Sequence, residues 1–133
     1  MKDYLFAYGT LANENVPEEI ASTVEQLKYV GDGFIFGRLY DLGEYPGAVL
    51  DGDRRNKVFG KIFELPDDRE VLECLDAYEA FDPQQPSKSL FVRRRTTISR
   101  PKQPPLMGWM YEYRGNVGAL PLIENGQYSK AST

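Results

Sequence analysis

Glycine and proline divide the apolar segments of this chain into short pieces. The 133 residues include 12 Gly and 9 Pro, many of them at the ends of apolar runs or inside them. Glycine weakens a flat strand and allows it to bend sharply, so a sheet of such strands can curl and close on itself. We therefore expect the strands of this chain to form a small barrel.

Several segments have the alternation or the apolar content of β-strands, and each is bounded by turn residues. They are Asp3–Tyr8, Phe34–Tyr40, Ala48–Leu50, Val58–Leu65, Phe91–Ile98 and Leu106–Arg114.

Two further segments have helical patterns. Residues 13–17 carry capping residues and a proline suited to a first helical turn, and apolar residues then recur at helical spacing to about Lys28, where Gly31-Asp32-Gly33 follows. Asp67 and Glu70 predict the cap of a second helix that runs to about Ala80. The Pro-rich stretch from Asp82 to Ser89 is expected to be a loop.

The helices do not alternate strictly with the strands, which favours the α+β class with a mixed or mainly antiparallel sheet. The length fits a single domain over residues 1–133. We expect a small closed or nearly closed mixed β-barrel of about five to six strands with two flanking helices.

Composition excludes several classes of function. The net charge of −4 and the pI near 4.9 argue against a nucleic-acid partner, because phosphate binding relies on a basic surface. Histidine is absent, which removes Ser-His-Asp and Cys-His catalysis and the common zinc sites. Acid–base chemistry must then use a carboxylate, a lysine or a tyrosine.

Cysteine content and hydropathy favour a soluble, cytoplasmic protein. Cys74 is the only cysteine, so the chain forms no internal disulfide, and its place within the second helix predicts a packed thiol. No apolar run approaches the roughly 18 residues that a membrane span requires, and no secretory signal pattern opens the sequence.

The first strand ends in Tyr8-Gly9-Thr10-Leu11, a candidate binding turn. Gly9 breaks the strand where a backbone can approach a ligand closely. Amide groups exposed in such a turn form a small anion-binding concavity, which suits a carboxylate or the oxyanion of an attacked carbonyl.

Glu79 is the candidate acid–base residue. On a helical wheel with about 100° per residue and Val71 at zero, Leu75 falls near 40° and Glu79 near 80°, within the apolar arc. Burial and the negative end of the helix dipole both disfavour ionisation there, so its pKa should rise toward neutrality. Glu73 and Asp76 fall outside the arc.

Two alternatives for Glu79 remain open: its side chain turns to solvent, or it pairs with an arginine. Arg93, Arg94 and Arg95 supply such partners and would alternate in direction along a strand, with Arg94 opposite the other two. One of them could instead hold an anionic group of a substrate.

Together these segments resemble the γ-glutamylcyclotransferase family, also called AIG2-like, over nearly the whole chain. The elements that carry the resemblance are Tyr8-Gly9-Thr10-Leu11, Tyr45-Pro46-Gly47-Ala48, Leu75-Asp76-Ala77-Tyr78-Glu79 and Trp109-Met110-Tyr111. The resemblance implies a small closed barrel with flanking helices, and an enzyme that uses no metal or organic cofactor.

It also implies that the α-amino group of a γ-glutamyl compound attacks its own γ-carbonyl, which gives 5-oxoproline and a free amine. Glu79 would transfer the protons, and the amides of Tyr8, Gly9, Thr10 and Leu11 would hold the glutamyl part. Tyr45, Tyr111 and Tyr128 are weaker candidates for the pocket wall. Phe91 is a departure, because many relatives have Tyr at this position.

Two other functions remain open. A non-catalytic protein could use the same pocket to sense a small acidic metabolite, because fold resemblance does not establish activity. Alternatively, the same chemistry could remove a γ-glutamyl protecting group from a larger intermediate, with the loop from Asp82 to Ser89 as the place of selectivity. The sequence leaves the leaving amine and the oligomeric state undetermined.

Overall fold

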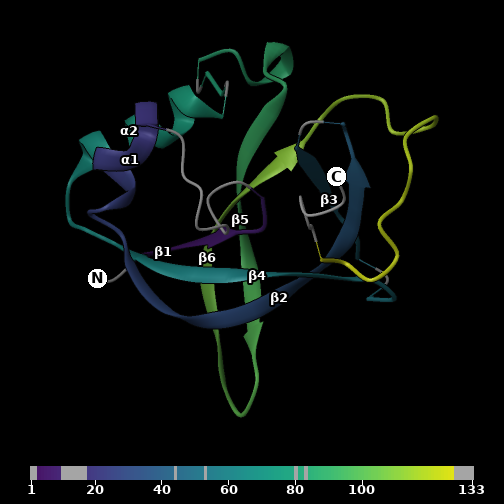
Figure 1. Cartoon of the computed structure of the whole chain (residues 1–133), viewed down its shortest axis with the longest axis horizontal. Coiled ribbons are helices and arrows are strands. Elements are labelled where there is room, and N and C mark those ends of the chain that lie inside the picture. Colours follow the sequence, from purple (N-terminus) through teal and green to yellow (C-terminus); the bar gives the residue numbers. More distant parts are fainter. Residues whose placement is uncertain are drawn as a thin grey trace.

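The computed structural model describes residues 3–9, 18–43, 45–52, 54–79, 81–82 and 84–127, and Figure 1 shows how the elements are arranged. Their bounds are β1 Asp3–Ala7, α1 Glu18–Val24, β2 Lys28–Asp41, β3 Pro46–Leu50, β4 Lys57–Leu65, α2 Arg69–Tyr78, the 3₁₀ turn η2 Pro86–Lys88, β5 Phe91–Arg100 and β6 Gln103–Tyr113.

Five strands close into a barrel. The hydrogen-bonded order runs β1, β4, β2, β3, β6, and a parallel pairing of β6 with β1, at Leu5 and Trp109, completes the circle. The β3–β6 pair is also parallel, whereas β1–β4, β2–β3 and β2–β4 are antiparallel. The extra strand β5 forms a long hairpin with β6 that extends away from the helices (Figure 1). The predicted α+β class and closed mixed barrel with two helices are thus confirmed.

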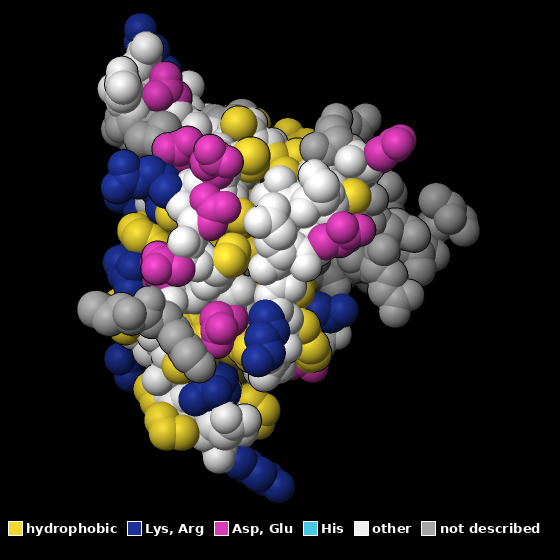
Figure 2. All heavy atoms as spheres, turned by 90° about the vertical axis from the view of Figure 1, so that its left-hand side faces the viewer, with side chains coloured by type: hydrophobic (Ala, Val, Ile, Leu, Met, Phe, Trp, Pro, Cys, Tyr) yellow, Lys and Arg dark blue, Asp and Glu magenta, His cyan; other side chains and the backbone are white. Residues whose placement is uncertain are grey.

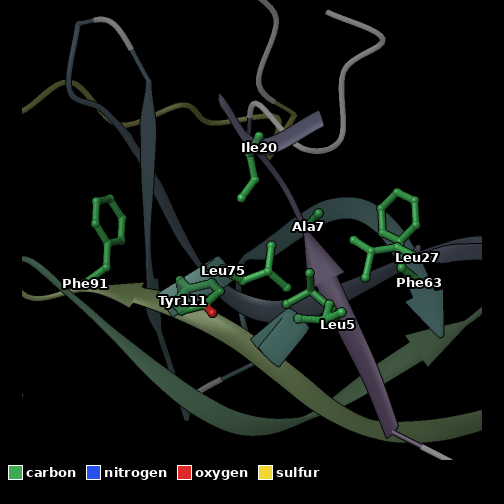
Figure 3. Packing of buried hydrophobic residues seen from close by; sticks show 9 residues of the cluster. Leu5, Ala7, Ile20, Leu27, Phe63, Leu75, Phe91 and Tyr111 are labelled. Carbon is green, nitrogen blue, oxygen red and sulfur yellow. The ribbon is translucent and has the colours of Figure 1, made fainter. Parts of the chain in front are cut away.

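β1 contributes to two separate cores because its side chains alternate in direction. Leu5 and Ala7 lie in the core between the barrel and the helices. Phe6 and Tyr8 lie in the core inside the barrel. Figure 3 shows the first of these cores, with Leu75 of α2 next to Leu5 and Tyr111. Burial on both faces explains why this strand is apolar almost throughout.

The end of the first helix differs from the prediction. α1 ends at Val24, and Lys28 already begins β2, which includes the Gly31-Asp32-Gly33 segment that was expected to follow the helix. Lys28 pairs with Glu64 of β4, and a bulge between Tyr29 and Gly31 follows. Pairing across the barrel therefore outweighs the local helical periodicity. The predicted start of this helix, at residues 13–17, lies outside the described residues.

The second helix is confirmed, with two corrections at the level of single residues. Its N-cap is Asp68, and not Asp67: the Asp68 side chain accepts a hydrogen bond from the Glu70 amide at 3.0 Å. Cys74 is exposed instead of packed, because the buried side of α2 runs through Val71, Leu75 and Asp76.

Figure 2 views the molecule from the side that carries the helices. Acidic side chains are spread over this surface, and basic ones gather toward its left edge and lower part. The exposed acids of α2, Glu70 and Glu73, agree with an amphipathic helix whose other side covers the core.

Among the helices in the described part of the chain, none is long and apolar enough to cross a membrane.

The junction of β6 with β1 gives a prediction about stability. A Cβ atom added at Gly108 would lie 2.7 Å from Ile98 Cδ1 and 2.9 Å from the Tyr4 carbonyl oxygen. Gly108→Ala should therefore force the strands apart and lower the free energy of unfolding by about 1–3 kcal/mol, as overpacking does. Urea denaturation measures the loss. Gly52→Ala is the control, because nothing lies within 4 Å of its added Cβ; equal stability of the two variants would contradict the close approach.

Candidate active site

A cavity of about 230 Å³ opens where β1 ends, between the end of α2 and the starts of β3 and β5. Pockets for drug-sized ligands have volumes of roughly 300–1,000 Å³, so this cavity suits a small metabolite. The residues that line it are Leu5, Phe6, Ala7, Tyr8, Gly9, Tyr45, Pro46, Tyr78, Glu79, Leu90, Phe91 and Tyr111.

Glu79 is the acidic residue in the wall of this cavity. It caps the C-terminus of α2, where its amide donates to the Leu75 carbonyl at 3.0 Å. Burial among apolar groups raises the pKa of its carboxyl to about 7. A rise in this pKa is what the helical wheel predicts, and burial is the one cause of the rise. A carboxyl that titrates near neutrality can both accept and return a proton at cellular pH.

Tyr8 and Gly9, from the predicted binding turn, both reach the cavity. The Tyr8 hydroxyl donates a hydrogen bond to the Tyr111 carbonyl and accepts one from the Ala48 amide at 3.2 Å. Burial raises the pKa of Tyr8, so its phenol stays protonated. A Cβ at Gly9 would lie 3.3 Å from two Pro46 ring atoms, so glycine allows the turn to pack against Pro46. Thr10 and Leu11 lie outside the described residues.

Behind the cavity wall lies a polar network that the sequence argument missed. Asp76 is 5% exposed, although the wheel placed it outside the apolar arc. The Tyr111 hydroxyl donates to Asp76 Oδ1 at 2.7 Å, and Arg93 Nε lies 3.1 Å from the same oxygen in an ion pair without hydrogen-bond geometry. Burial raises the pKa of Asp76, and both partners oppose that rise. The sequence signal for the burial of Asp76 was its spacing from Glu79, because residues three apart in a helix occupy neighbouring positions on its surface.

The three arginines alternate along β5 as predicted. Arg93 and Arg95 lie over the Trp109 ring, at 4.4 and 4.7 Å from its centroid, while Arg94 pairs with Glu112 at 3.2 Å. Arg95 pairs with Asp3. Each of the three thus has an acidic partner other than Glu79, and none belongs to the cavity wall. The structure therefore favours a structural role for this run.

The mouth of the cavity is apolar. Tyr45 and Leu90 line it and are 37% and 40% exposed. Phe91, where many relatives have Tyr, belongs to the wall, with ring centroids 6.0 Å from Tyr45 and 5.5 Å from Tyr113. The described residues of the 82–89 segment include η2 and do not line the cavity. Tyr128 lies outside the described residues.

Within the ranges given above, no group of three or more His, Cys, Asp or Glu residues is arranged to hold a metal ion.

Comparison with known families identifies the class of this fold and site. Residues 5–130 match the family described as gamma-glutamyl cyclotransferase, AIG2-like. The chain belongs to this family. A search of curated proteins finds no match.

Solved structures share the fold. An AIG2-like protein from Mus musculus is 17% identical with a TM-score of 0.70, over 96% of this chain and 88% of that one. The protein ytfP from Escherichia coli is 26% identical with a TM-score of 0.63, over 98% and 97% of the two chains. YkqA from Bacillus subtilis is 17% identical with a TM-score of 0.69; the match covers 96% of this chain but only 40% of YkqA.

The raised pKa of Glu79 predicts how stability depends on pH. The folded protein binds the Glu79 proton more tightly than the unfolded chain does. Glu79 therefore does not lower the stability of the fold at pH values below its ordinary pKa of 4.5, and it lowers the stability increasingly as the pH rises to about 7. Glu79→Gln should therefore gain stability relative to wild type as pH rises from 4 to 8, by on the order of 3 kcal/mol. Urea denaturation across this range checks it, and a difference independent of pH would contradict the raised pKa of Glu79.

Proposed function

We propose that this protein is a γ-glutamyl cyclotransferase that converts a γ-glutamyl amine or γ-glutamyl amino acid into 5-oxoproline and a free amine. The observation that carries the proposal is a carboxyl of pKa about 7, Glu79, in the wall of a small and otherwise mainly apolar cavity. Family membership supports the same class of reaction.

In the proposed reaction Glu79 takes a proton from the α-ammonium of the bound substrate. The free amine then attacks the γ-carbonyl carbon, a C–N bond forms, and a five-membered ring closes. Glu79 returns that proton to the leaving nitrogen as its bond to the γ-carbon breaks. The second proton, which the ring nitrogen loses when it becomes an amide, passes by way of Glu79 to the departing amine, which leaves as an ammonium ion. The atoms balance without water or a co-reactant. Because the attack is intramolecular, holding the substrate folded supplies much of the rate.

We assign the glutamyl part to the turn after β1. Gly9 leaves its backbone uncovered at the cavity wall, where a ligand can come close. The amides of Tyr8, Gly9, Thr10 and Leu11 would bind the α-carboxylate or the developing oxyanion. The apolar mouth at Tyr45 and Leu90 would then face the leaving amine.

The first test is to incubate the purified protein with γ-glutamyl amino acids and γ-glutamyl amines, including the ε-lysine isopeptide, and to quantify 5-oxoproline. The wild type should release it, and Glu79→Gln should not, because the amide is nearly isosteric but cannot carry the proton. Glu73→Gln is the matched control, since Glu73 is exposed on the same helix. Full activity in folded Glu79→Gln would refute the assignment. Binding without release would favour the metabolite sensor.

The pH profile gives a second test. As a general base Glu79 must be ionised in the free enzyme, so kcat/KM should rise with pH through about 7 and fall tenfold per unit well below it. Initial rates between pH 5 and 8, with a substrate that the first test identifies, measure this limb. A flat profile would mean that no tuned carboxyl takes part in the limiting step.

A further inference from the structure

The hydroxyl of Tyr111 is held from outside the cavity. It donates to Asp76 Oδ1 at 2.7 Å, and the Asp76 side chain is only 7% exposed and does not belong to the cavity wall. Arg93 balances the Asp76 charge from 3.1 Å and is itself fixed over the Trp109 ring. Asp76 therefore lies behind Tyr111, away from a bound substrate.

Both ends of Tyr111 are fixed. The Tyr8 hydroxyl donates to its backbone carbonyl, while Asp76 accepts its phenolic hydrogen. A phenol has a single O–H to donate, so with that hydrogen committed its oxygen can only accept further hydrogen bonds. Tyr111 belongs to the cavity wall, and burial first, then Asp76 and Glu79, raise the pKa of its phenol, so the phenol lies within electrostatic reach of Glu79.

We propose that Asp76 is a positioning residue that holds the Tyr111 hydroxyl as a hydrogen-bond acceptor for the α-amino group of the substrate. The proposal rests on the proposed function. An ammonium group has only donors, so it suits a cavity that offers the Glu79 carboxylate and the Tyr111 oxygen together. After Glu79 takes one proton, the Tyr111 oxygen still holds a remaining N–H and keeps the nitrogen directed at the γ-carbonyl.

Arg93 has a definite part in this arrangement. A second buried carboxylate without a partner would compete with Glu79 for the substrate's cationic group and for protons. The ion pair with Arg93 neutralises Asp76, so Asp76 can orient the phenol while Glu79 remains the acid–base group.

The test compares two ligands that differ only in the α-amino group: L-glutamine, the simplest γ-glutamyl amide, and 4-carbamoylbutanoate, which lacks the amine. Calorimetric titrations use Glu79→Gln protein, so that turnover does not interfere. Adding Tyr111→Phe or Asp76→Asn should each weaken glutamine binding about tenfold, the size of one hydrogen bond to a charged group, and leave 4-carbamoylbutanoate within about twofold.

The combined variant shows whether Asp76 acts through Tyr111. With Tyr111→Phe present, adding Asp76→Asn should change glutamine affinity less than twofold, because the hydroxyl that it positions is gone. If the two substitutions instead weaken glutamine binding independently, so that their fold-changes multiply, Asp76 does not act through Tyr111 and the positioning role is overturned. Tyr111→Phe keeps the Asp76–Arg93 pair and so decides the acceptor role even if Asp76→Asn fails to fold.

The outcomes separate this inference from the proposed function. Absence of 5-oxoproline with wild-type protein refutes the cyclotransferase, whereas the difference between the two ligands decides the role of Tyr111. Equal losses for both ligands would show that Tyr111 only shapes the cavity. Failure of the Glu79→Gln protein to bind either ligand would overturn this inference too.

Discussion

The burial of β1 on both faces is the constraint on which the rest of the molecule depends. Leu5 and Ala7 hold the helices against the barrel, while Phe6 and Tyr8 fill its interior. The strand can serve both cores only if β4 and β6 pair with its two edges, which closes the barrel. Strand β1 then ends close to the end of α2, and the cavity forms where these two ends meet. Fold and site therefore have one origin in the alternation of a single short strand.

The two carboxyls near the end of α2 differ in their position relative to the cavity. Glu79 lines the wall with a pKa raised by burial, and Asp76, one turn earlier on the same helix, is paired with Arg93 behind the wall. Two carboxyls of one helix thus have different surroundings, and only one of them faces the cavity. This difference in environment leaves one carboxyl with a pKa near neutrality and the other in an ion pair.

The sequence allowed the strands, the second helix and the barrel class to be predicted, because each depends on local periodicity and on Gly and Pro. It also placed Glu79 on the buried side of its helix. It did not predict that Lys28 to Gly33 belong to β2, since that segment is determined by pairing with β4 across the barrel. Nor did it predict burial of Asp76: Arg93 and Tyr111, which make burial possible, are 17 and 35 residues away. Such partners are known only once the strands are in register.

The cavity wall joins residues 5–9 with Tyr111, near opposite ends of the chain. These parts meet only where β6 pairs with β1, so a partly folded chain has no complete site. A molecule that fits the cavity therefore binds only the closed barrel and shifts the folding equilibrium toward it, by an amount that grows with its concentration. The resistance of this protein to unfolding and proteolysis inside a cell would then follow the local supply of such a molecule.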